Sequence, residues 1–91
     1  MRKIKTLEKD LEAEVGIIRL KMCLGEENGF TDCGIYKILS ETNDYFSAVD
    51  LNCTRDSAIR ILNLLFSENV TPITLADVIH DLENYSFLQK Y

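Results

Sequence analysis

The spacing of apolar residues over the first 22 positions constrains the fold of this chain more than any other feature. The apolar side chains recur about every 3.6 residues, the period of a plain α-helix rather than the 3.5 of a sustained coiled coil. The positions are Ile4, Leu7, Leu11, Val15, Ile18 and Met22. Acidic residues near the start and basic residues near the end would suit the helix dipole, and Gly25 would end the helix. The pattern predicts a long first helix.

A second apolar line, Ile17, Leu20 and Leu24, would run beside this stripe on the same helix. Left exposed, such a line forms an aggregation-prone patch, and dimerisation commonly covers patches of this kind. The alternative is that another part of the chain covers it within one molecule. We predict that these three residues contact a partner protein or a second copy. Replacing Leu20 and Leu24 by glutamate should then give a folded monomer.

The stretch between Cys33 and Cys53 can be interpreted in two ways. As a hairpin, residues 34–40 and 45–51 would form strands around a turn at residues 41–44, where turn-forming residues gather. As a helix, the same stretch offers apolar residues at tolerable spacing, and the fold would be all-α. Gly34 near the start and Asn43 in the middle disfavour a continuous helix. We therefore predict the hairpin.

Two more helices are predicted after this stretch. Thr54 would cap a helix over residues 54–67, and Thr74 would cap a last one over residues 74–86. The helix over 54–67 is apolar around more than half of its circumference, which predicts that it is the most buried element. The predicted fold is a single α+β domain over residues 1–91. It is mostly helical, with three helices and one two-stranded antiparallel hairpin in the order α-β-β-α-α, and the alternative is all-α.

The cysteines favour a reducing compartment. Their number, three, cannot close into disulfides within one chain, and the first residues lack the apolar core of a secretory signal. No apolar run is long enough to span a membrane. We therefore expect a cytoplasmic protein with reduced, buried thiols. The potential zinc ligands are far apart in the sequence: Cys23, Cys33, Cys53 and His80. They do not form the closely spaced pairs that are typical of zinc sites, so no metal or other cofactor is expected.

The only histidine, His80, lies close in sequence to Asp77 and Asp81. Their helical spacing could gather the three around a divalent ion, but a solvated polar helix face explains them more simply. No glycine-rich phosphate loop, nucleophile elbow or paired-metal motif occurs in the chain. The sequence does not predict an enzyme.

Charge is uneven along the chain. Residues 1–40 are balanced, and the whole net charge of −5 falls on residues 41–91. Residues 54–67 and 74–86 could be taken for a helix-turn-helix. The recognition helix would then carry Asp77, Asp81 and Glu83 with no lysine or arginine, which phosphates would repel. Direct binding to nucleic acid is not expected.

Two functions remain open on these grounds. The first is a small cytosolic interaction or regulatory module that binds a partner protein, with a homodimer possible. The second is an acidic inhibitor that competes with nucleic acid for a basic cleft in another protein, of the anti-nuclease or anti-CRISPR type. In the second case, Asp77, Asp81 and Glu83 would face the partner.

Overall fold

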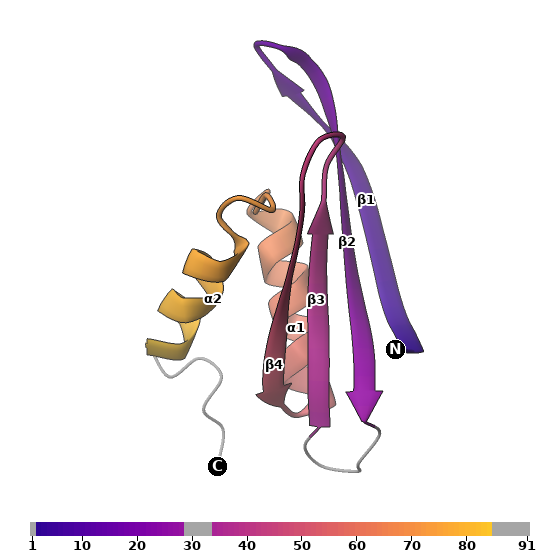
Figure 1. The fold of residues 1–91 in the computed structure, drawn as a ribbon, viewed down its shortest axis with the longest axis vertical. Helices are drawn as coiled ribbons and strands as arrows, with labels where there is room; N and C mark the ends of the chain where they lie inside the picture. Colours follow the sequence, from indigo (N-terminus) through magenta and orange to yellow (C-terminus); the bar gives the residue numbers. More distant parts are fainter. Residues whose placement is uncertain (1, 29–33, 85–91) are drawn as a thin grey trace.

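The chain forms a four-stranded antiparallel sheet with two helices packed against one of its faces (Figure 1). The computed structural model describes residues 2–28 and 34–84. The elements are β1 (Arg2–Ala13), β2 (Gly16–Asn28), β3 (Gly34–Glu41), β4 (Phe46–Cys53), α1 (Arg55–Ser67) and α2 (Leu75–Asn84). Strands make up 52% and helices 29% of the described residues. The predictions of a mostly helical domain with three helices and of an all-α fold are therefore both wrong.

Each strand pairs with the next one along the chain, so the spatial order is β1-β2-β3-β4. β1 pairs with β2 along the full length of β1, from Arg2↔Glu26 to Ala13↔Gly16, with an irregularity between Lys3 and Lys5. The pairing of β2 with β3, in contrast, stops at Lys21↔Glu41. The part of the β1–β2 hairpin nearest its turn therefore projects past the end of β3 (Figure 1). We call this projection, residues 9–20, the arm.

The β1–β2 hairpin occupies the residues for which the sequence predicted the first helix. The prediction failed because a step of four residues keeps side chains on one side of a helix and also on one face of a strand. Leu7 and Leu11 are four apart, and so are Ile18 and Met22. In the structure Leu7 pairs with Met22, and Leu11 pairs with Ile18. These four residues of the predicted helical stripe thus lie on the inner face of a hairpin, whereas Val15 lies in its turn and is exposed.

Two lysines on β1 make the alternation of polar and apolar residues in this strand hard to recognise in the sequence. Lys5 and Lys9 occupy inward positions beside Leu7, where apolar residues would be expected. The Lys5 ammonium donates a hydrogen bond of 3.0 Å to Oδ1 of Asn63 on α1. Lys9 donates to the backbone carbonyl of Phe66, and its ammonium lies 4.4 Å from the centre of the Phe66 ring. The aliphatic parts of both lysine side chains extend from β1 toward α1, and their ammonium groups reach polar partners there.

A turn at Glu14 and Val15 joins β1 to β2. The residue after it, Gly16, has φ of 120°, a backbone conformation that residues with a side chain rarely adopt. The sequence interpretation placed Gly16 in the middle of a helix. Its actual role is to let the chain reverse direction at the tip of the arm.

The second hairpin confirms the prediction for residues 34–51. β3 and β4 pair antiparallel from Gly34↔Cys53 to Glu41↔Phe46. The turn between them is closed by a hydrogen bond of 2.9 Å from the Thr42 amide to the Tyr45 carbonyl. It lies within one residue of the predicted turn at 41–44. What the sequence did not reveal is that this hairpin joins a larger sheet through β3.

The two helices lie close to their predicted positions. Thr54 caps α1 as predicted, since its Oγ1 accepts a hydrogen bond of 3.2 Å from the Ser57 amide. α2 begins directly after Thr74, whose Oγ1 donates instead to the carbonyl of Thr71. The predicted end of the last helix, residues 85 and 86, lies outside the described residues.

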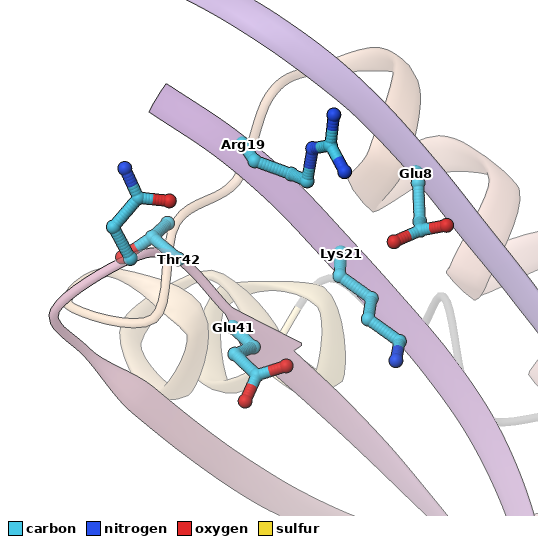
Figure 2. A pocket seen from close by; sticks show the side chains of 6 residues that line it. Glu8, Arg19, Lys21, Glu41 and Thr42 are labelled. Carbon is cyan, nitrogen blue, oxygen red and sulfur yellow. The ribbon is translucent and has the colours of Figure 1, made fainter. Parts of the chain in front are cut away.

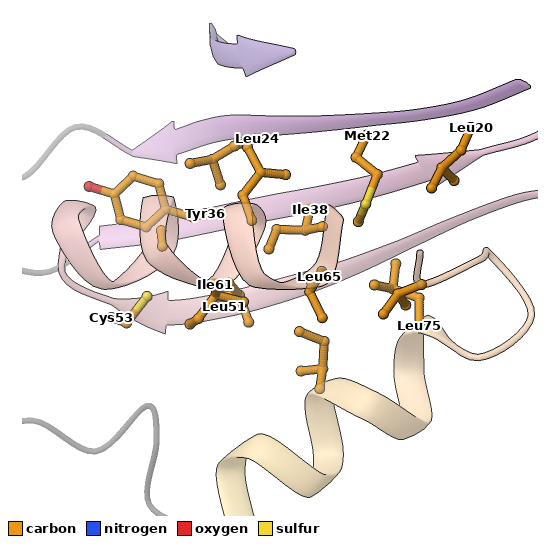
Figure 3. Close-up of a cluster of buried hydrophobic side chains, with 14 residues drawn as sticks. Leu20, Met22, Leu24, Tyr36, Ile38, Leu51, Cys53, Ile61, Leu65 and Leu75 are labelled. Atoms are coloured by element: carbon orange, nitrogen blue, oxygen red, sulfur yellow. The ribbon is translucent and has the colours of Figure 1, made fainter. Parts of the chain in front are cut away.

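The hydrophobic core lies between the sheet and the helices (Figure 3). α1 packs against β2, β3 and β4, whereas α2 packs against β4. Leu20 and Leu24, which the sequence placed on an exposed line, are fully buried in this core. The cluster comprises Leu20, Met22, Leu24, Tyr36, Ile38, Leu51, Cys53, Ala58, Ile61, Leu62, Leu65, Val70, Leu75 and Ile79. The helix over residues 54–67 contributes five buried residues. It is not the most buried element as predicted, because β2 contributes as many among its described residues.

Candidate protein-binding face of the sheet

None of the described elements covers the sheet face opposite the helices. We call it the outer face. Because side chains alternate along a strand, the neighbours of the core residues point to it. Cross-strand pairing aligns these side chains in rows across β1 to β4. They are Lys3, Thr6, Glu8, Asp10, Glu12, Ile17, Arg19, Lys21, Cys23, Ile35, Lys37, Leu39, Glu41, Phe46, Ala48, Asp50 and Asn52.

An apolar row crosses the middle of the outer face. Cys23 pairs with Leu39, which in turn pairs with Ala48. Phe46 lies next to this row and leaves 61% of its surface exposed. A hollow brings Cys23, Leu39 and Phe46 together with Lys3, Lys21 and Glu41. The centre of the outer face therefore offers apolar contact area beside two ammonium groups and one carboxylate.

Charged side chains of both signs border the apolar row. On one side, Lys21 lies between Glu8 and Glu41 in the cross-strand register. On the other, Lys37 Nζ lies 3.6 Å from the Asp50 carboxylate. Exposed pairs of this kind contribute at most about 1 kcal/mol each to stability. These charges contribute less to stability than to selecting which partner surfaces can bind to the outer face.

A second hollow lies where the arm leaves the body of the sheet (Figure 2). It is lined by Glu8, Arg19, Lys21, Glu41, Thr42 and Asn43. Nε of Arg19 donates a hydrogen bond of 3.3 Å to the Asp10 carboxylate across the hairpin. The hollow thus combines two bases, two acids and two polar side chains, a composition suited to hydrogen bonding with another polar chain.

The structure distributes the six predicted partner-binding residues over three places. Ile17 is on the arm and 65% exposed, whereas Leu20 and Leu24 are in the core. Asp77 and Asp81 are exposed on α2. Glu83 lies within α2, and its side chain is outside the described part of the structure. These residues therefore do not form one surface.

Sequence reasoning missed the outer face, although the chain contains a signal for it. From Arg19 to Leu24, basic or small residues at odd positions alternate with large apolar ones at even positions. This is the period of a half-buried strand. The alternation is weaker in β1, where lysines point inward, so the helical spacing dominated the interpretation.

The cysteines lie in different layers of the fold. Cys53 belongs to the core cluster, while Cys23 is on the outer face and is shielded there, with Thr6 Oγ1 at 3.6 Å from its sulfur. Both are buried and neither is joined by a disulfide. The prediction that Cys23 is poorly accessible is confirmed, and Cys33 lies outside the described residues.

Neither a metal centre nor a membrane span is found in the described part of the chain. Among residues 2–28 and 34–84, no three histidine, cysteine or acidic side chains are grouped to hold an ion, and Asp77, His80 and Asp81 are no exception. The helices described there are too short and too polar to cross a bilayer. Comparison of the chain with known protein families, curated proteins and solved structures found no match.

Proposed function

We propose that this protein is a small cytoplasmic interaction module that binds a partner protein through the outer face of its sheet and catalyses no reaction. The observation that carries the proposal is the cross-strand pair of Leu39 and Ala48, with the exposed Phe46 beside it, on a face that no described element covers. Cys23 and Cys53 are buried and neither is joined by a disulfide, which supports a reducing compartment.

The layout of the outer face resembles the general anatomy of protein interfaces. Such interfaces have an apolar centre with aromatic anchors and a polar rim. Here Phe46 is the exposed aromatic residue, and Lys21, Lys37, Glu41 and Asp50 form the rim. Because the rim carries both signs, it favours a partner with mixed charge rather than a uniformly charged one such as nucleic acid.

The test compares one variant of the outer face with one matched control. Phe46→Lys removes the exposed aromatic group, and Ile73→Lys makes the same change at a residue that is 69% exposed between the helices. A partner captured from host lysate with the wild-type protein is purified, and its affinity for each variant is measured by calorimetry. We expect at least a tenfold weaker Kd for Phe46→Lys and no change for Ile73→Lys. Equal affinity of both variants would refute the assignment of the outer face.

The alternative function, an acidic competitor of nucleic acid, uses a different surface of the molecule. α2 contains no lysine or arginine, and its Asp77 and Asp81 are exposed one turn apart. A partner bound there would be a basic protein whose affinity falls steeply with salt. In the same calorimetric assay, Asp77→Asn/Asp81→Asn would then weaken binding while Phe46→Lys would not. The two surfaces make the two functions separable in one experiment.

A further inference from the structure

A small hollow lies at the centre of the outer face, and we call it the central hollow. It is lined by Lys3, Lys21, Cys23, Leu39, Glu41 and Phe46. Its volume is about 190 Å³. Sites for cofactors and drug-sized ligands are larger, at about 300–1,000 Å³. An apolar cavity of about 150 Å³ holds one molecule of benzene, so the central hollow accommodates one large side chain rather than a whole ligand.

The apolar residues of the central hollow determine what kind of side chain it can bind. Cys23 is buried, and Leu39, its cross-strand partner, is half-buried. Phe46 lines the same hollow and leaves most of its ring exposed, so it can pack against a group placed on Leu39. A polar side chain would lose hydrogen bonds to water in this position. The hollow therefore favours an apolar side chain.

Three of the four bases on the described outer face already have an acid beside them. Nε of Arg19 and the Asp10 carboxylate are 3.3 Å apart, and Nζ of Lys37 and the Asp50 carboxylate are 3.6 Å apart. Lys21 lies between acidic residues of the two neighbouring strands (Figure 2). A carboxylate from a partner would gain little at any of these bases, because the acid already present repels it.

Lys3 is the fourth base, and it forms no ion pair within the described part of the structure. It is exposed at the rim of the central hollow. Its cross-strand partner is Gly25, which has no side chain, and the residue paired with Gly25 on β3 is Lys37. Glu41 lies on the far side of the apolar floor. A carboxylate that approaches Lys3 therefore meets an unmatched base and stays away from Glu41.

We propose, on the basis of the proposed partner-binding function, that the central hollow binds a partner segment with a large apolar side chain and an acidic residue near it. The apolar side chain packs on Leu39 and against Phe46, while the carboxylate pairs with Lys3. The acidic residue is directly beside the apolar one in the segment or one residue away from it. A uniformly apolar segment leaves Lys3 unmatched, and a uniformly acidic one leaves the apolar floor empty.

Selection from a library of random linear peptides tests both requirements at once. The wild-type protein should enrich peptides with a large apolar residue and a nearby aspartate or glutamate. Lys3→Glu should enrich lysine or arginine in place of that acid. Arg55→Glu makes the same change at an exposed residue of α1, on the other side of the sheet, and should enrich the same peptides as the wild type. Identical peptides for the wild type and Lys3→Glu, or no enrichment by the wild type, would overturn the proposal.

Calorimetry with one enriched peptide then measures the contribution of each residue. Lys3→Gln should weaken the Kd about threefold to fivefold, since an exposed ion pair contributes at most about fivefold to an affinity. This loss should disappear in about 1 M salt, where the screening length is about 3 Å. Phe46→Lys should weaken the Kd at least tenfold, and Arg55→Gln should leave it unchanged.

The outcomes separate this proposal from the function on which it rests. If Lys3→Gln binds the peptide like the wild type while Phe46→Lys does not, the acidic requirement is wrong and the outer face remains the binding surface. If Phe46→Lys also binds like the wild type, the peptide occupies another surface and both are wrong. Equally strong displacement of the peptide by 4-methylpentanoic acid, or wild-type protein that sediments as a dimer and loses the dimer in Phe46→Lys, would assign the hollow to another occupant and overturn the proposal.

Discussion

Ile17 and Leu20 lie three positions apart on β2 and on opposite faces of the sheet. Leu20 is fully buried between the sheet and the helices, whereas Ile17 is mostly exposed on the arm. On a helix these two residues would have been neighbours on one face. The strand places Leu20 in the core and Ile17 on the surface, so the same mutation should cost much more stability at Leu20 than at Ile17.

Truncation of the two side chains measures this difference. Leu20→Ala should lower the free energy of unfolding by about 2–5 kcal/mol because it leaves a cavity in the core. Ile17→Ala should change it by less than about 0.5 kcal/mol. Urea unfolding followed by circular dichroism gives both values. Leu20→Glu/Leu24→Glu should unfold the chain, since it buries two charges. A folded double-glutamate monomer would contradict the burial of both residues.

At the scale of elements, the two helices begin in different ways. Thr54 accepts the Ser57 amide and so satisfies one of the amides that the first turn of α1 leaves unpaired. Thr74 precedes α2 but directs its hydroxyl to the Thr71 carbonyl at 3.4 Å. The side chain of Thr54 thus stabilises a helix start, and that of Thr74 stabilises the preceding turn.

Alanine substitution distinguishes these two roles. Thr54→Ala should destabilise the protein by about 1 kcal/mol because α1 loses its capping hydrogen bond. Thr74→Ala should cost less, since a long hydrogen bond at an exposed turn contributes little. Thermal and urea unfolding of both variants provide the comparison. A larger loss for Thr74→Ala would mean that its hydroxyl caps α2 in solution.

At the scale of the whole molecule, the sheet divides the chain into a covered and an uncovered layer. Cys53 is among the core residues under α1, whereas Cys23 is beneath neighbouring side chains on the outer face. Both are buried, but different motions expose them. Access to Cys53 requires separation of the helices from the sheet, while access to Cys23 requires a local movement of side chains.

Thiol labelling tests this two-layer arrangement. In a Cys33→Ser background, Cys23 should react with a thiol reagent faster than Cys53, at a rate that changes little with low concentrations of urea. The rate at Cys53 should rise with urea in parallel with global unfolding. Mass spectrometry of digested samples resolves the two sites. Equal rates with the same urea dependence would mean that both thiols are protected by the same core.

The elements in the second half of the chain could be predicted from sequence because the residue patterns that specify them are local. Thr54 and the broad apolar surface of residues 54–67 predict α1, and the turn residues near Asn43 predict the β3–β4 hairpin. A capping hydrogen bond and a tight turn form between residues a few positions apart. They therefore depend little on the rest of the chain.

The structure of residues 2–28 and the position of the candidate site were decided by tertiary contacts. Leu7, Leu11, Ile18 and Met22 satisfy both a helical and a strand spacing, so local pattern does not distinguish the two. In the structure, β3 pairs with β2 and α1 covers the inner face of the hairpin, with Lys5 and Lys9 reaching α1. A two-stranded hairpin is marginal alone and becomes stable when a third strand and a helix bury its apolar side. The sequence by itself determined the local elements of the second half. Contacts between residues distant in sequence determined that β2 is a strand, and therefore that the outer face and the arm exist.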